Sequence, residues 1–271
     1  MLNIFSPFNL LIFVESRMRI LVLYTLRKKK VRKTIQEHLY SFKHYRLEDD
    51  IIYVNVGSSG IPAYLQTIKF DVVIFHYILL AAERFIIGNG WDRKMKGMEK
   101  ISGFKIAIPQ DEYCYTNRLI QFFKQVDIDI ICTCFYKEKD IDFAYRKYLS
   151  EKVKYILVFT GYVDENESKR LDVFLTPYAE RVIDIGYRAS MLPAYLGRHG
   201  QLKYQLIDIF KKRLVGKNLK IDIESSNQEL TKEDKQLVKL GDSWSTFLLN
   251  CKAFIGCEGG SSLLDLFFCL I

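Results

Sequence analysis

A turn rich in glycine and serine contains residue types that could bind an anion. The apolar segment Ala253–Gly256 leads into a turn whose residues are Cys257, Glu258, Gly259, Gly260, Ser261 and Ser262. A strand, a glycine turn and a hydroxyl group at a helix start direct backbone N–H groups at a phosphate. The same residue types also form an ordinary helix cap after a strand, so both interpretations stay open.

Carboxylates and a histidine follow two apolar segments that we expect to be strands. Asp111 and Glu112 come after one such segment, and His76 closes another. Asp111 could deprotonate or orient a hydroxyl group, and His76 could act as a base or contact a sugar. The alternatives are helix capping ahead of Asn117 for Asp111 and a hydrogen-bonded histidine in a half-buried strand for His76.

The sequence has no pattern typical of a metal site or of the common cofactor sites. The closest cysteine pair, Cys132 and Cys134, lies on an apolar stretch and indicates buried strand thiols. His38, His44 and His199 have no partner pattern, so we expect no metal. Neither G-x-G-x-x-G nor G-x-x-x-x-G-K-[ST] occurs, which gives no support to nicotinamide, flavin or P-loop chemistry, and we expect no cofactor.

The composition indicates a globular chain with room for two domains. It has 271 residues, of which 49% are hydrophobic. The net charge of +8 comes from 40 Lys and Arg against 32 Asp and Glu, a moderate excess that does not predict nucleic-acid binding. The cysteines show no disulfide pattern, so a cytoplasmic location is the simplest expectation.

Apolar segments alternate with helical segments through the first half of the chain. The strand candidates are Arg19–Tyr24, Ile51–Val56, Asp71–His76, Lys105–Pro109 and Ile128–Cys132. The helix candidates are Val31–Phe42, Ile78–Phe85, Asn117–Val126 and Asp140–Leu149. Near-continuous apolar strands separated by helices predict a doubly wound parallel sheet, covered on both faces.

A second set of the same kind follows. Its strand candidates are Lys154–Phe159, Arg181–Ile185, Leu219–Ile223 and Ala253–Gly256, and its helix candidates are Leu202–Leu214, Lys232–Leu240 and Trp244–Cys251. We therefore expect an α/β protein with two Rossmann-like domains. No linker rich in Pro, Gly or Ser fixes the boundary between them.

The expected organisation is an N-terminal extension over residues 1–17, a first domain over 18–150 and a partial second domain over 151–271. Met1–Val14 is apolar but too short to span a bilayer, and Met18 opens the first strand. The final apolar residues read as a helix cut short, so we expect the second sheet to be incomplete.

Several motifs of the second half together carry a family resemblance. They are Thr160–Val163, Asp184–Ala189, Leu192–Arg198, Asp222–Ile223 with Gly241–Trp244, and Gly256–Asp265. This set resembles bacterial glycosyltransferases of the GT-B fold that build surface polysaccharides. The resemblance implies that the second domain holds a nucleotide-sugar donor and that the first presents a glycan or polyprenyl-linked acceptor.

Glycosyl transfer develops negative charge on the leaving diphosphate, which arginines and helix N-terminal N–H groups can stabilise without a metal. Arg188, expected just after a strand, and Arg198 are the diphosphate candidates; the alternatives are surface arginines or ion pairs. The turn from Glu258 to Ser262 would add N–H and hydroxyl groups. Asp242 precedes a helix and could contact the donor or simply cap that helix.

A basic run from Arg27 to Lys33 leaves two alternatives open. It could attract an anionic membrane surface or a polyprenyl diphosphate, or it could be a solvated helix face. Two functions therefore remain after the sequence alone: a glycosyltransferase of cell-surface glycan synthesis, inactive if the chain is truncated, or a non-catalytic α/β module that binds a nucleotide or a partner.

Overall fold

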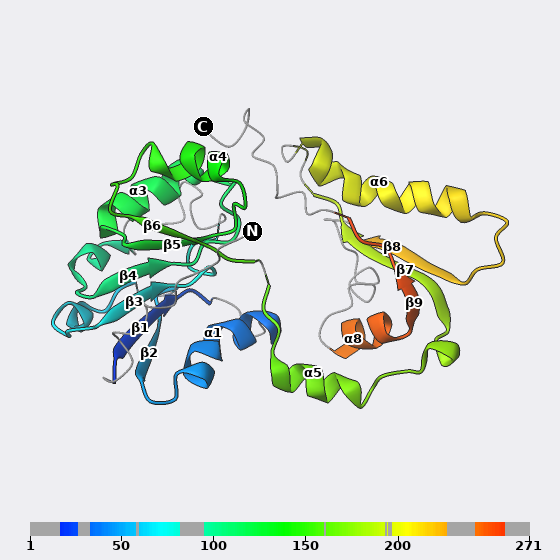
Figure 1. Ribbon diagram of the computed structural model, residues 1–271, viewed down its shortest axis with the longest axis horizontal. Helices are drawn as coiled ribbons and strands as arrows, with labels where there is room; N and C mark the ends of the chain where they lie inside the picture. The colour runs from blue at the N-terminus through cyan, green and yellow to red at the C-terminus, as the bar shows by residue number, and fades with distance from the viewer. Residues whose placement is uncertain are drawn as a thin grey trace, which may run out of the picture.

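The computed structural model describes residues 17–26, 33–57, 60–81, 95–159, 161–192, 194, 197–226 and 242–257. These residues form an α/β protein with two parallel sheets, one of six strands and one of three (Figure 1). Helices pack on both sheets. The predicted fold class, two Rossmann-like parallel sheets, is confirmed.

The first sheet has the strand order β2-β1-β3-β4-β5-β6, and all neighbouring strands are parallel. Its strands are β1 (Arg19–Tyr24), β2 (Asp50–Asn55), β3 (Val72–Phe75), β4 (Phe104–Ala107), β5 (Ile130–Thr133) and β6 (Lys154–Leu157). Each was predicted as a strand because it is a short run of mainly β-branched and aromatic residues. We call β1 to β6 and their helices the first unit.

The longer helical segments of the first unit agree with predicted ones, with shifted ends, whereas the sequence did not predict its two 3-10 turns. The segments are α1 (Lys33–Tyr45), α3 (Thr116–Val126), α4 (Glu138–Ile141), the π-helical turn η6 (Asp142–Arg146), and the 3-10 turns η3 (Ala63–Gln66) and η5 (Met98–Lys100). The predicted helix Ile78–Phe85 differs: residues 78–81 are not helical, and the rest of it lies outside the described residues.

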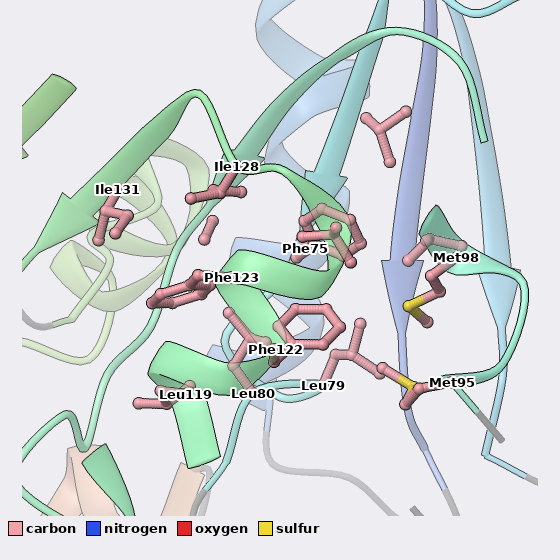
Figure 2. Close-up of a cluster of buried hydrophobic side chains, with 14 of the residues drawn as sticks. Phe75, Leu79, Leu80, Met95, Met98, Leu119, Phe122, Phe123, Ile128 and Ile131 are labelled. Carbon is pink, nitrogen blue, oxygen red and sulfur yellow. The ribbon is translucent and has the colours of Figure 1, made fainter. Parts of the chain in front are cut away.

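Alternate residues of the central strands pack on opposite faces of the first sheet. Leu23 and Phe75 belong to the cluster that includes Phe123 of α3 (Figure 2). Val22 instead packs with Leu39 of α1. A strand that is buried on both faces must be apolar at nearly every position, which is why β1 and β3 show no polar alternation.

The second sheet has the order β8-β7-β9, with all strands parallel. Its elements, which we call the second unit, are β7 (Ile183–Ser190), α6 (Gly197–Leu214), β8 (Ile221–Ser226), α8 (Asp242–Leu249) and β9 (Cys251–Phe254). Leu206, Phe210 and Leu214 of α6 pack against a core of Tyr187 and Ile223, as their spacing predicted. The predicted helix Lys232–Leu240 lies outside the described residues.

Two sequence expectations about these strands are wrong. Lys154–Phe159 was assigned to the second set, but β6 pairs with β5 and forms the edge of the first sheet. A short apolar run predicts a strand without predicting its neighbour. In addition, β7 continues to Ser190 because Ile185, Tyr187 and Ala189 keep facing the α6 core, so Arg188 lies inside the strand rather than after it.

The described chain passes from the first sheet to the second through α5 (Glu165–Asp172) and the 3-10 turn η7 (Tyr178–Glu180) (Figure 1). Asp164 caps α5 by accepting a hydrogen bond from the Glu167 N–H (2.9 Å). Glu167 also pairs with Lys33 of α1, so the start of this connection lies against the first unit. Among the described residues, no helix is both long and apolar enough to cross a bilayer.

Candidate functional site

The strand order places one switch point in each sheet. In both units the first strand lies between the second and the third, so the helices that follow lie on opposite faces. In open parallel sheets, ligands bind beyond the carboxyl ends of the strands at such a point. In the first sheet this is the end of β1 and β3, where Thr25 and His76 are both buried.

His76 is fully buried and both of its ring nitrogens have partners. Its Nε2 lies 2.8 Å from Nδ1 of His38, and its Nδ1 accepts a hydrogen bond from the Ile78 N–H (3.2 Å). Because Nδ1 of His76 accepts, its proton is on Nε2 and points at His38. Nδ1 of His38 then accepts, which places the proton of His38 on Nε2.

This arrangement favours two neutral imidazoles. Burial, together with the neighbouring His38 ring, lowers the pKa of His76 to about 3. Burial also lowers the pKa of His38. His76 matches the hydrogen-bonded alternative; a role for it as a base would require one of its two bonds to break, and this role stays a prediction.

His38 is the residue of this pair that the sequence did not identify, because no pattern in the sequence indicated a partner for it. It lies on α1, and its ring makes edge contacts with Tyr77 after β3 and Tyr162 of the connecting segment (centroid distances 5.1 and 5.7 Å). One helix residue therefore contacts the sheet edge and the start of the connection. Only the amphipathic pattern of α1 could have indicated that it faces inward.

Asp111 lies at the same edge, beyond β4, which neighbours β3 in the sheet. The residue is exposed, and its Oδ1 accepts a hydrogen bond from the Tyr113 hydroxyl (3.4 Å). Partial desolvation of the carboxyl raises its pKa. The capping alternative is wrong, because α3 begins after Tyr115 without a side-chain cap. Asp111 therefore presents a carboxylate to solvent at a ligand-binding edge.

Glu112, the next residue, points inward and is 1% exposed. Its Oε1 accepts hydrogen bonds from the hydroxyls of Thr133 (2.8 Å) and Tyr145 (2.7 Å), and its Oε2 accepts from the Cys134 N–H (2.6 Å). Burial raises its pKa to about 7, although these three bonds act in the opposite direction. Two adjacent carboxylates thus have different environments, one exposed and one enclosed.

Arg188 of the second unit is engaged within the protein. Its guanidinium donates to Oδ1 of Asp222 (2.5 Å) and to the Asp222 carbonyl (2.8 Å), and it lies 4.3 Å from the centroid of the Phe247 ring. Its Nε is buried without a hydrogen-bond partner. This is the ion-pair alternative, with Asp222 as the partner rather than Asp184 or Glu180. Contact with a diphosphate stays a prediction.

Arg198 and Asp242 lie in the first turns of two helices that begin at the same edge of the second sheet. Arg198 is exposed on the first turn of α6, which follows the carboxyl end of β7. Asp242 begins α8, whose N-terminus lies at the same edge because α8 runs back to the start of β9. The turn formed by Glu258, Gly259, Gly260, Ser261 and Ser262 lies outside the described residues, beyond Cys257.

Within the described ranges, no group of three or more His, Cys, Asp or Glu side chains could hold a metal ion. Comparison of the chain with family models, with curated proteins and with solved structures gave no match.

Proposed function

We propose that the chain is a glycosyltransferase that moves a sugar from a nucleotide-sugar donor to a glycan or lipid-linked acceptor. The observation that carries this proposal is the pair of Rossmann-like sheets, each with the switch-point strand order β2-β1-β3 or β8-β7-β9. Two such sheets in one chain offer one ligand edge for each of two substrates. The motifs of the second half supply the resemblance to the GT-B fold.

On the donor side, the proposal uses the edge where α6 and α8 begin. Helix N-termini carry partial positive charge, and the exposed Arg198 lies on the first turn of α6. Together they favour a diphosphate as the ligand. Arg188 contributes indirectly, because its pair with Asp222 ties β7 to β8.

On the acceptor side, the proposal uses the exposed carboxylate of Asp111 beyond β4. A carboxylate with a raised pKa is a better proton acceptor than an ordinary aspartate, and it can take a proton from an attacking hydroxyl group. His76, which follows β3, lies at the same edge and contacts His38 there. The basic run from Arg27 to Lys33, whose residues before Lys33 lie outside the described part of the chain, is the proposed contact with an anionic membrane.

The donor site is tested by isothermal titration calorimetry with UDP-, GDP- and dTDP-sugars. We expect one of the three to bind, and we expect Arg198→Ala to weaken it by about tenfold, the loss typical of one charge-assisted contact. Arg213→Ala is the matched control, because Arg213 is an exposed arginine at the opposite end of the same helix. Absence of binding by all three donors would contradict the proposal.

The second candidate is an α/β module that binds a nucleotide or a partner without transfer. The observation in its favour is that Nη1 and Nη2 of Arg188 and both ring nitrogens of His76 make contacts within the protein. Mass spectrometry of a donor incubated with the protein separates the two candidates. Release or transfer of the sugar supports the enzyme, whereas tight binding of an unchanged donor supports the module.

A further inference from the structure

The buried carboxylate of Glu112 connects three segments of the chain at the proposed acceptor edge of the first sheet. Glu112 lies in the segment between β4 and α3, and Cys134 follows β5. Thr133 and Cys134 donate to Glu112 from the end of β5, and Tyr145 donates to it from the π-helical turn η6. One side chain therefore links three segments that are separated in sequence but adjacent at the carboxyl ends of neighbouring strands.

We propose that Glu112 is a positioning residue, which fixes the loop between β4 and α3 and so holds the carboxylate of Asp111 in place. This inference rests on the proposed function, in which Asp111 is the residue that acts on the acceptor hydroxyl. Because adjacent residues cannot move independently, three hydrogen bonds on Glu112 restrict the backbone that carries Asp111.

The rest of the loop is consistent with a fixed geometry. The Thr116 hydroxyl donates to the Glu112 carbonyl (2.6 Å), and the Cys114 N–H donates to the Asp111 carbonyl (3.0 Å). Tyr115 adopts a left-handed conformation (φ 54°), which a residue other than glycine keeps only when its surroundings impose it. The loop thus has bonds at both ends and an enforced conformation between them.

The chemistry of the three donors explains why a side chain with an acceptor oxygen occupies this place. The Cys134 N–H can only donate, so it requires an oxygen, whereas the two hydroxyls can donate or accept. A glutamine fits the same space, with its oxygen toward Cys134 and its NH₂ toward the hydroxyls. An alanine leaves all three donors without their acceptor. Glu112→Gln therefore keeps the shape and the hydrogen bonds of the side chain, whereas Glu112→Ala removes both.

The titratable groups around Glu112 come from each element packed against it. They are Tyr145 of η6, Cys132 and Cys134 at the end of β5, and Asp111 of its own loop. Burial and the proximity of Glu112 raise the pKa of Tyr145 and of both thiols, so these groups are neutral near pH 7. Among these groups Asp111 is therefore the charged neighbour, and its negative charge adds to burial in raising the pKa of Glu112.

Amide hydrogen exchange tests the positioning directly. For Glu112→Ala we expect protection of residues 110–116 and 133–135 to fall by more than about tenfold, because three hydrogen bonds lose their acceptor. Glu112→Gln should retain most of this protection. Tyr145→Phe removes a single donor and should give a smaller loss, while Tyr148→Phe alters an exposed tyrosine of the same region and serves as the matched control.

Transfer kinetics provide the second measurement. We expect Glu112→Ala to lower kcat by about tenfold to a hundredfold at unchanged donor KM, since misplacement of a reacting group affects the chemical step. Glu112→Gln should restore kcat. Equal protection of the loop in the wild type and in Glu112→Ala would overturn the inference, as would equal loss of kcat in both variants. If the wild type transfers no sugar, the proposed function fails, and the exchange data alone decide the inference.

Discussion

The first three strands of each unit have the same order, but the ionisable groups of the two units lie in different environments. The first unit buries His76 and Glu112 completely and satisfies them with hydrogen bonds. The second unit keeps its charges nearer the surface as ion pairs, such as Arg188 with Asp222 and Lys211 with Glu224. The buried groups should therefore make the stability of the first unit depend on pH, whereas exposed ion pairs, which the first unit also has in Lys152 with Asp127, should contribute a dependence on ionic strength.

Core size underlies this difference. The first sheet has a large apolar cluster on one face and a smaller one on the other, whereas the second unit has one cluster around Tyr187, Ile207 and Ile223. A larger core can enclose a polar group together with its partners. In a small sheet with a single described cluster, such groups stay within reach of water. One oppositely charged partner is then enough to offset their partial desolvation.

The largest expected effect tests whether the two cores are independent. Phe123→Ala should lower the free energy of unfolding of the first unit by about 3–5 kcal/mol, because Phe123 is fully buried. Hydrogen exchange should accelerate in β1–β6 and not in β7–β9. Ile223→Ala should show the reverse pattern. Equal acceleration in both sheets after either substitution would mean that the units unfold together.

The next effect tests the pH dependence of the first unit. The folded pKa of His76, about 3, lies below its unfolded value, so its contribution is present above pH 6.5 and is lost as pH falls toward 3. The loss should be roughly 4 kcal/mol in this window. His76→Asn should abolish it, since the Asn oxygen can still accept from the Ile78 N–H.

Urea unfolding at pH 7, 5 and 4 measures this effect. His44→Asn is the matched control, because His44 is exposed on the same helix as His38. If the wild type and His76→Asn lose stability in parallel on acidification, the acid sensitivity originates elsewhere and the comparison between the units is wrong in this respect.

A third substitution tests how closely α8 packs on the second sheet. A Cβ at Gly186 would overlap Sγ of the buried Cys251 and lie 3.1 Å from Phe247. Gly186→Ala should therefore cost about 1–3 kcal/mol in thermal unfolding, the usual range for overpacking. Adding Cys251→Ala should restore part of the loss. Gly256→Ala, with no atom within 4 Å of the added carbon, should be close to neutral.

The smallest expected effect concerns the partly exposed pair between Lys211 and Glu224, whose charged atoms are 3.4 Å apart. Lys211→Met should lower the free energy of unfolding by about 0.5 kcal/mol or less at low salt. The difference from the wild type should vanish at about 1 M NaCl. Comparison of urea unfolding at the two salt concentrations measures it. A cost that persists at high salt would indicate that the lysine stem contributes through packing instead.

Strands were the most predictable feature of this fold, and the reason is local. β1 and β3 consist of apolar residues that pack on two faces, so their composition alone identifies them. The pairing of β6 and the length of β7 could not be predicted in the same way. Both depend on hydrogen bonds to strands distant in sequence, β5 and β8.

The site was predictable only at the level of edges. The sequence placed His76 and Asp111 at the carboxyl ends of strands, and both lie there. The sequence did not identify His38, nor Asp222 as the partner of Arg188, because each is defined by a contact made across the fold, to His76 and to Arg188. Glu112 was adjacent to a predicted residue, but only its burial distinguishes it from Asp111.

The single passage of the described chain between the sheets has a consequence for biosynthesis. All described strands of the first sheet precede those of the second, and β6 is the last of them. Domains generally fold as units, the N-terminal one first, while the chain is still being made. The six strands of the first sheet can therefore pair before the described strands of the second sheet have all been translated.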